Sequence, residues 1–556
     1  MSGTLLTRRA VDMAPVWRQY WLQRWTKLPP WPAPRLVRLL SASLGRKAIK
    51  ERKRALTRPP LVADFPDGRS PFLGVVGLGQ DGNLASDAGV LQFPMKGHLL
   101  TVVPTRTGKG TCQIIPNLLL YGGSAFVIDV KGENYAITAR RREQMFRHSR
   151  VLRFAPLEAD SAQYNPLDFI RTMDTGISVA ETFDDARLLA SMLLPQKTRE
   201  EYWDVEARNL LTLLLMYTAV RYLRNDPSRT MRTVMDLLFP APAKDEREGS
   251  HGLRKVIDDI LVDARTLQEP ILVSLASSFL EHESRVFSNI ASTCRAAMQI
   301  WHSPNLLRAT EASDFSFYDL KASMCRPFEA NPSPTTLYIV IPPQNLREYR
   351  GVVRMMVGLA IAELTRPAQW ASWHDWRPSA PCDVLFLLDE LPTLGYMGPV
   401  VDGLAYLAGY GIKIWSFVQN MGQLKEIYRD EAHNFTANAG AMCFFGVNDP
   451  ETAEYVEKQL GETNEYSHHY ETTSTSTSRS DSVGEDSWTS SDSSSASVTS
   501  NVRFVREPIA KAAEIRAIDP DLQFIFIRNT PPILATKMPY YDFRGFDGLY
   551  DTWNGG

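Results

Sequence analysis

The segment PTRTGKGT has residue types suited to binding a phosphate. Its glycines allow a tight turn whose backbone N–H groups can wrap an anion, and Lys109 adds a full positive charge. The strict pattern GxxxxGK[ST] is not met, because Val103 stands at the place of the first glycine and Gly110 at that of the metal-binding hydroxyl. We nevertheless expect the whole segment to bind phosphates: Pro104, Thr105, Arg106, Thr107, Gly108, Lys109, Gly110 and Thr111.

A second segment, DVLFLLDELPTLG at 383–395, is an apolar run that ends in two carboxylates. Ligands of α/β sheets bind at the carboxyl ends of strands, so both acids are placed for chemistry. Asp389 is the predicted Mg²⁺ ligand, with a hydroxyl from Thr111 or Thr107 as a second ligand. Glu390 is the predicted catalytic residue that orients and activates water. The plainer alternative is that the two acids cap a helix.

A third apolar run, 412–418, ends in the amide of Gln419, thirty residues after Asp389. An amide at this place can sense the γ-phosphate and relay its loss. Lys109, Glu390 and Gln419 together predict a site for nucleoside-triphosphate hydrolysis. Its two main segments lie about 280 residues apart, which indicates a large insertion within one domain.

Short apolar runs alternate with helical stretches in most of the chain, which predicts an α/β fold with a parallel sheet. The predicted strands are 99–103, 125–128, 151–154, 336–341, 384–388, 412–418, 442–447 and 522–527. Helical patterns at 207–220, 271–287 and 291–300 predict an all-α insertion. Ser and Thr dominate 467–501, and so polar a segment is expected to be disordered.

The resulting division of the chain has six parts. They are a basic, Trp-rich N-terminal arm (1–70), a first part of a nucleotide-binding domain (71–174), an inserted all-α domain (175–330), a second part (331–466), a disordered Ser/Thr-rich loop (467–501) and a C-terminal part (502–556).

The N-terminal arm is the only strongly charged region. Residues 1–60 carry 14 Lys and Arg against two acids, whereas the whole chain has a net charge of -2. Trp17, Trp21 and Trp25 share one helix face, flanked by cations, which favours contact with a membrane surface or another protein. Packing of this face inside the protein is the alternative, and nucleic-acid binding by 45–54 is a third.

The rest of the sequence argues against several classes of protein: disulfide-bonded, zinc-binding, membrane-spanning and secreted. Five scattered cysteines without CxxC spacing argue against disulfides or a zinc site and for a reducing cytoplasm. No run reaches the roughly 18 apolar residues of a membrane span, and no signal-peptide pattern is found. We therefore expect no transmembrane segment and a cytoplasmic protein that makes a peripheral membrane contact through 1–60.

Taken in order, these segments resemble the TraG-like coupling proteins of type IV secretion, a family of conjugation ATPases. The similar strings run collinearly over about residues 95–545: PTRTGKGT, FVIDVKGE, YNPLDFI, YWDVEARNLL, LFLLDELPTLG, AGYGIKIWSFVQN, QLKEIY and PILATKMPYYD. The GKG form of the loop is usual in this family. Asp129 and Lys131 match a motif beside the site, for which we expect only a supporting role.

The resemblance implies a RecA-like P-loop NTPase fold with an inserted all-α domain, and ATP with Mg²⁺ as cofactors. It implies a homo-hexamer that feeds DNA, a relaxase or a secreted protein to a type IV secretion channel, whose components would be partners. Two features depart from the family: most members have transmembrane helices before this domain, and Leu407-Ala408-Gly409 lacks the arginine that some relatives place there.

Two other functions remain open at this stage. A chromosome-partition-type DNA translocase would share the fold, but it would need a winged-helix tail, for which 531–556 is too short. A docking platform that binds nucleotide without hydrolysing it is the second alternative.

Overall fold

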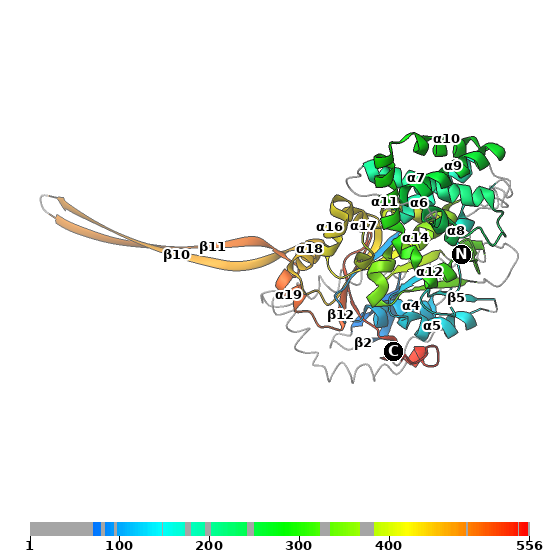
Figure 1. Cartoon of the computed structure of the whole chain (residues 1–556). Helices are drawn as coiled ribbons and strands as arrows, with labels where there is room; N and C mark the ends of the chain where they lie inside the picture. The colour runs from blue at the N-terminus through cyan, green and yellow to red at the C-terminus, as the bar shows by residue number, and fades with distance from the viewer. Residues whose placement is uncertain are drawn as a thin grey trace.

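The computed structural model describes residues 70–78, 84–93, 97–146, 148–172, 179–194, 202–241, 249–322, 334–366, 383–484, 487–542 and 544–553. A large sheet forms its centre (Figure 1). Its strands are β1 (Phe72–Leu78), β2 (Leu84–Gln92), β3 (His98–Val102), β4 (Ala125–Asp129), β5 (Arg150–Phe154), β6 (Thr335–Val340), β7 (Val384–Leu388), β8 (Ile412–Val418), β9 (Ala439–Phe444), β12 (Leu522–Ile527) and β13 (Ile533–Thr536).

The 11 strands lie in the order β2-β1-β13-β12-β9-β3-β8-β7-β4-β6-β5. From β9 to β5 all neighbours are parallel, which confirms the predicted α/β class. The prediction that 522–527 joins a parallel arrangement is wrong, because β12 pairs antiparallel with both β9 and β13. A short turn joins β12 to β13, and a parallel pair would need a crossover of a dozen or more residues.

Both faces of the central strands are buried, which explains their continuous apolar sequences. On one face Leu100 and Val102 belong to a core with helix α14 (Pro343–Thr365). On the other face Leu99 packs in a core with Leu118 of helix α4 (Ile115–Leu120). Helix α5 (Glu133–Gln144) lies beside α4 in the ribbon diagram. The sheet is therefore held rigidly between two helical layers.

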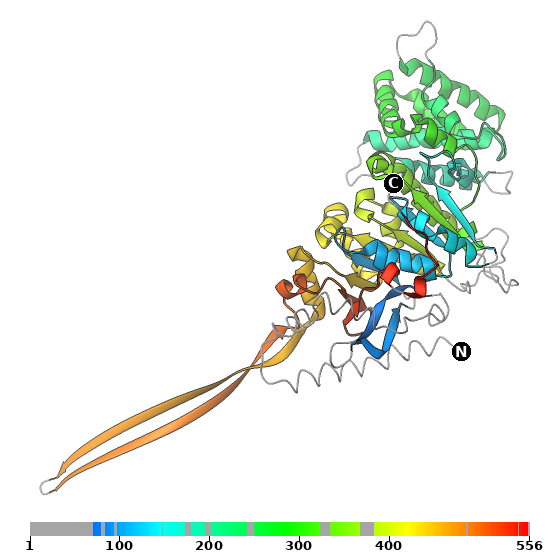
Figure 2. The same ribbon diagram turned by 90° about the horizontal axis from the view of Figure 1, so that it is seen from below.

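Between β5 and β6 the described residues contain helices and no strand, and we call helices α6 to α13 the helical part (Figure 2). The predicted single helix at 271–287 is instead two helices, because His282 and Glu283 between them have extended backbone. The helices are α6 (Val179–Leu193), α7 (Tyr202–Arg221), α8 (Met231–Leu238), α9 (Gly249–Thr266), α10 (Pro270–Glu281), α11 (Ser284–Met298), α12 (Pro304–Ala309) and α13 (Asp319–Ala322).

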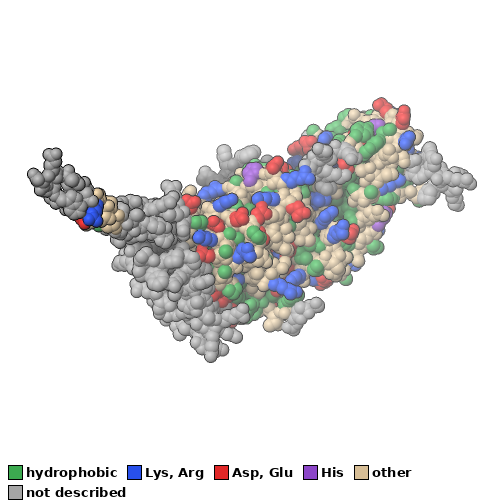
Figure 3. Space-filling view, turned by 90° about the vertical axis from the view of Figure 1, so that its left-hand side faces the viewer, with side chains coloured by type: hydrophobic (Ala, Val, Ile, Leu, Met, Phe, Trp, Pro, Cys, Tyr) green, Lys and Arg blue, Asp and Glu red, His purple; other side chains and the backbone are tan. Residues whose placement is uncertain are grey.

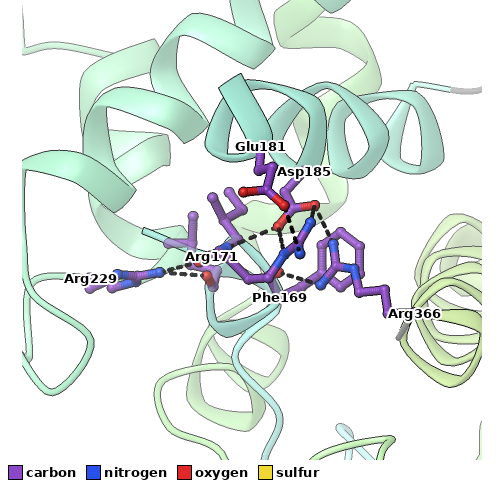
Figure 4. Close-up of polar contacts among 8 residues, drawn as sticks. Phe169, Arg171, Glu181, Asp185, Arg229 and Arg366 are labelled. Carbon is purple, nitrogen blue, oxygen red and sulfur yellow. Dashed lines mark hydrogen bonds and ion pairs between the residues drawn. The ribbon is translucent and has the colours of Figure 1, made fainter. Parts of the chain in front are cut away.

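An arginine–aspartate cluster joins the helical part to the sheet (Figure 4). The buried Asp185 of α6 accepts from the Arg171 Nε at 2.8 Å and backbone N–H at 3.0 Å, and also from Arg366 at the end of α14. Arg366 donates to the Phe169 carbonyl at 3.0 Å and lies over the Phe169 ring. Arg229 reaches the same segment through two carbonyl oxygens, those of Leu167 and Ile170. One carboxylate thus links α6 both to the segment before it and to the end of α14.

The Ser/Thr-rich segment is not disordered, contrary to the prediction for 467–501. It forms a two-stranded antiparallel ribbon of β10 (Glu462–Gly484) and β11 (Ser487–Pro508), which projects away from the body and from the helical part in Figures 1 and 2. The prediction was based on the lack of apolar residues alone. It left out the backbone hydrogen bonds between the two strands and the preference of Thr for β-strands. Hydroxyl pairs across the strands, Ser476–Ser495 at 2.9 Å and Ser478–Ser493 at 3.0 Å, add to the ladder.

Within the described ranges, no helix has the length and apolar character needed to cross a bilayer. On the face shown in Figure 3, acidic and basic side chains are interspersed over the body. The expectations for the arm, including Trp17, Trp21 and Trp25, lie outside the described residues.

The Asp185 cluster predicts a large stability cost for a small change. Asp185→Asn keeps the side-chain shape but leaves Arg171 and Arg366 without their shared countercharge, and the Asp185 side chain is only 4% exposed. We expect Asp185→Asn to lower the free energy of unfolding by about 3 kcal/mol. Asp160→Asn is the control, because the Asp160 side chain is 79% exposed in its ion pair with Arg153. This variant should lower the free energy of unfolding by less than about 1 kcal/mol. Chemical unfolding measures both, and equal losses would contradict the assigned role.

Candidate active site

The sheet brings the three predicted segments to one edge. β8 lies between β3 and β7 and is parallel to both, with Val102 opposite Val418 and Leu388 opposite Ser416. The loop after β3, Gln419 after β8 and the two acids after β7 therefore leave the sheet side by side. Strand register, and not sequence proximity, assembles the site.

The loop after β3 has the backbone of an anion cradle. Arg106 and Gly108 have φ values of 62° and 101°, which places a left-handed conformation on either side of Thr107. Such alternation turns successive N–H groups toward one side of the chain. At Gly110 no heavy atom lies within 4 Å of the position that a Cβ would take, so the loop mouth is open at this residue. The Cys112 N–H then bonds to the Gly108 carbonyl at 2.8 Å and begins the helical turn into α4.

Lys109 is the cation at the centre of the site. Its ammonium lies 2.8 Å from the Asp389 carboxylate and forms a hydrogen-bonded ion pair with Glu390. Burial lowers the pKa of Lys109, but the two carboxylates more than offset burial and leave the pKa raised. The ammonium is therefore charged at neutral pH.

The two carboxylates have opposite pKa shifts. Burial raises the pKa of Asp389, and the attraction of Lys109 only partly offsets it. Burial acts in the same direction on Glu390, but Lys109 and an amide hydrogen bond from Gln419 outweigh it and lower the pKa of Glu390. Burial thus favours the protonated form of Asp389, which a neighbouring cation counteracts, whereas Lys109 and Gln419 favour the ionised form of Glu390.

The backbone of Glu390 is also unusual. Its φ of 55° and ψ of 40° lie in the left-handed region, which costs energy in a residue with a Cβ. This conformation ends β7 and starts the short helical turn Leu391–Leu394. The pair of acids is therefore not the ordinary helix cap that the sequence left open, because Glu390 makes no side-chain capping bond there.

Gln419 lies at hydrogen-bond distance from the acid pair. Its Nε2 donates to Glu390 Oε2 at 3.0 Å, and its Oε1 accepts from Gln423 Nε2 at 3.4 Å. Asn420 caps helix α16 (Met421–Tyr428) by accepting from the Gln423 N–H. Sequence reasoning did not single out Gln423, although its position four residues after Gln419 at a helix start could have shown it.

The other predicted loop residues surround Lys109. Thr107 Oγ1 donates to the Pro104 carbonyl at 2.5 Å, and Thr111 Oγ1 donates to the Gly108 carbonyl at 3.3 Å. Thr105 and Arg106 are exposed at the mouth of the loop. The assignment of Thr111 as a metal ligand stays a prediction, because its hydroxyl donates to the Gly108 carbonyl of its own loop.

Asp129 ends β4, the neighbour of β7 on the side away from β8. It accepts from the Tyr135 N–H at 2.8 Å and from Asn134 at 3.4 Å, and burial raises its pKa to about 6. Lys131 lowers the pKa of Glu390 by its charge. Lys131 thus acts on the acid pair through its charge, whereas Asp129 ends the strand beside it.

This donor set fits a nucleotide with Mg²⁺. The open loop and Lys109 suit phosphates, and the partly buried carboxylate of Asp389 suits Mg²⁺, which is usually held by one or two carboxylates together with phosphates and water. The described residues contain no group of three or more His, Cys, Asp or Glu side chains that could hold a metal ion.

Several known proteins have sequences similar to this chain. A conjugal transfer protein TraG of Escherichia coli is 29% identical over 66% of this chain and 55% of its own length. Protein VirD4 of Rhizobium radiobacter is 26% identical over 82% of this chain and 59% of its own length. The chain thus spans a little over half the length of these relatives.

Solved structures with a similar fold include the plasmid coupling protein TrwB in complex with ADP and Mg²⁺. It aligns with a TM-score of 0.54 at 18% identity and covers 82% of this chain and 88% of that one. TrwB lacking its first 70 residues, in a trigonal form with sulphate, gives 0.55 at 18% identity over 79% and 85% of the two chains. The likeness confirms the predicted RecA-like P-loop NTPase fold.

The family model for type IV secretory system conjugative DNA transfer matches residues 43–548, which is most of the sequence. The predicted resemblance is confirmed, and the chain belongs to the type IV secretory system conjugative DNA transfer family.

Proposed function

We propose that this protein is an ATP-driven coupling protein that recruits DNA, with a relaxase or a protein substrate, and feeds it to a type IV secretion channel. The observation that carries the proposal is the contact of Lys109, on the phosphate loop, with Asp389 and Glu390 at the end of β7. A cation, a carboxylate that can hold a metal ion and a second carboxylate that can act as a base, together at the carboxyl ends of parallel strands, are the groups that phosphoryl transfer to water requires.

Each residue has a distinct part in this proposal. The backbone of the loop from Pro104 to Thr111 and the Lys109 ammonium hold the phosphates, while Asp389 and the Thr111 hydroxyl hold Mg²⁺. Bound Mg²⁺ neutralises phosphate charge and favours departure of the leaving oxygen. Glu390 orients the attacking water and accepts its proton, and Gln419 reports on the γ-phosphate through its bond to Glu390.

The choice of ATP and Mg²⁺ draws support from similar proteins. TrwB structures hold ADP with Mg²⁺ and a non-hydrolysable ATP analogue, and their fold is that of this chain. The proposed partners are those that the family resemblance implies: other copies of this chain in a homo-hexamer, DNA, a relaxase or secreted protein, and the channel components. The proposed place of action is the cytoplasmic face of the bacterial membrane, reached through the basic arm at 1–60.

Glu390→Gln tests whether the protein hydrolyses ATP or only binds it. Loss of the base should lower kcat by about 100-fold or more while ATP affinity changes little. Phosphate release is measured with single-stranded DNA present. Glu311→Gln is the matched control, because Glu311 pairs with Arg232 at the surface of the helical part and should keep wild-type turnover. Equal, background rates for wild type and Glu390→Gln would contradict hydrolysis and favour the docking platform.

Co-sedimentation of the full-length protein with anionic liposomes tests the membrane contact. Replacing Trp17, Trp21 and Trp25 together by Ala should reduce the bound fraction at least threefold, because the aromatic face supplies the interfacial burial. Binding that persists undiminished in the triple variant would rule out this face as the contact.

A further inference from the structure

Lys537 reaches the phosphate loop from the opposite end of the chain. It follows β13, the last strand of the sheet, and only 8% of the residue is exposed. Its Nζ donates to the Thr107 carbonyl at 2.8 Å and lies 4.9 Å from the centre of the Phe445 ring. The residue belongs to the string PILATKMPYYD, for which the proposed function has so far given no role.

The bond from Lys537 fixes one peptide of the loop. In a planar trans peptide, the carbonyl oxygen and the following N–H point in opposite directions. When Lys537 holds the Thr107 carbonyl on its side, the Gly108 N–H must point away from Lys537. The left-handed φ of 101° at Gly108 belongs to the anion cradle described above. A loop amide directed in this way is one of the donors that such a cradle offers to phosphate.

Other contacts hold Thr107 but carry no charge. The Thr107 hydroxyl donates to the Pro104 carbonyl at 2.5 Å. Gly446, with φ of 61°, packs so closely that a Cβ there would lie 2.7 Å from Thr107 Cγ2. Among these contacts Lys537 supplies the charge-assisted bond, and such bonds are about twice as strong as neutral ones. Its ammonium also lies 3.9 Å from the place that a Cβ on Gly108 would occupy, beside the cradle itself.

We propose that Lys537 is a positioning residue of the nucleotide site, which orients the Thr107–Gly108 peptide so that the Gly108 N–H faces the phosphate. The inference rests on the proposed function and adds a residue to it. It makes the C-terminal strand a structural support of the phosphate loop, 430 residues away in sequence. A purely stabilising lysine is the alternative, and the two roles differ in what they predict for nucleotide affinity.

The test is the dissociation constant of a non-hydrolysable ATP analogue with Mg²⁺, measured by calorimetry on the full chain. Lys537→Met should raise it about tenfold, whereas Lys537→Arg, which keeps a charged donor, should stay within about threefold of wild type. Lys537→Gln, a shorter and neutral replacement, should also weaken binding and serves if the Met variant does not fold.

Lys413→Met is the matched control. Lys413 is equally buried and donates to the Ala408 carbonyl at 3.1 Å, but it lies at the amino end of β8, away from the loop. It should lower the melting temperature without changing nucleotide affinity. The inference is overturned if Lys537→Met binds nucleotide within twofold of wild type. It is also overturned if Lys413→Met loses as much nucleotide affinity as Lys537→Met. A wild-type protein that binds no nucleotide instead overturns the proposed function itself, and the inference with it.

Discussion

The site depends on one electrostatic constraint: two adjacent, partly buried carboxylates, Asp389 and Glu390, share the ammonium of Lys109. Neighbouring negative charges away from bulk water repel each other strongly, so a cation must lie between the loop and the strand end. That requirement ties a loop to a strand end about 280 residues further along the chain. A bound nucleotide with Mg²⁺ would satisfy it equally well, because Asp389 would hold the metal ion and Lys109 would pair with the phosphates.

The sheet supplies the precision that this arrangement needs. β3, β8 and β7 are parallel neighbours, and cores on both faces hold them in register. Two residues from later segments also support the site. Lys537 donates a hydrogen bond to the phosphate loop, and Gln423 donates one to Gln419. Asp185 of the helical part is bonded to Arg366 at the end of α14, and α14 packs on the same sheet.

Sequence reasoning predicted the central strands and brought Lys109, Asp389, Glu390 and Gln419 to one edge, because parallel strands have a strong apolar signal and a known ligand-binding end. It missed the antiparallel strands near the sheet edge, since β1, β2 and β13 are short or weakly patterned. It was wrong about the ribbon, where backbone pairing offsets the lack of apolar residues. Lys537 and Gln423 lay inside quoted strings, but only tertiary contacts show what they touch.

The claim that two distant segments form a single nucleotide site is tested most directly by calorimetry of ADP binding in the presence of Mg²⁺. Three folded proteins suffice: wild type, Lys109→Met on the loop and Asp389→Asn on the strand end. The account predicts measurable binding by wild type and an affinity loss of at least about tenfold in each variant. It also predicts that removing Mg²⁺ weakens wild type but leaves Asp389→Asn nearly unchanged. Wild-type affinity in either variant, with Mg²⁺ present, would contradict the account.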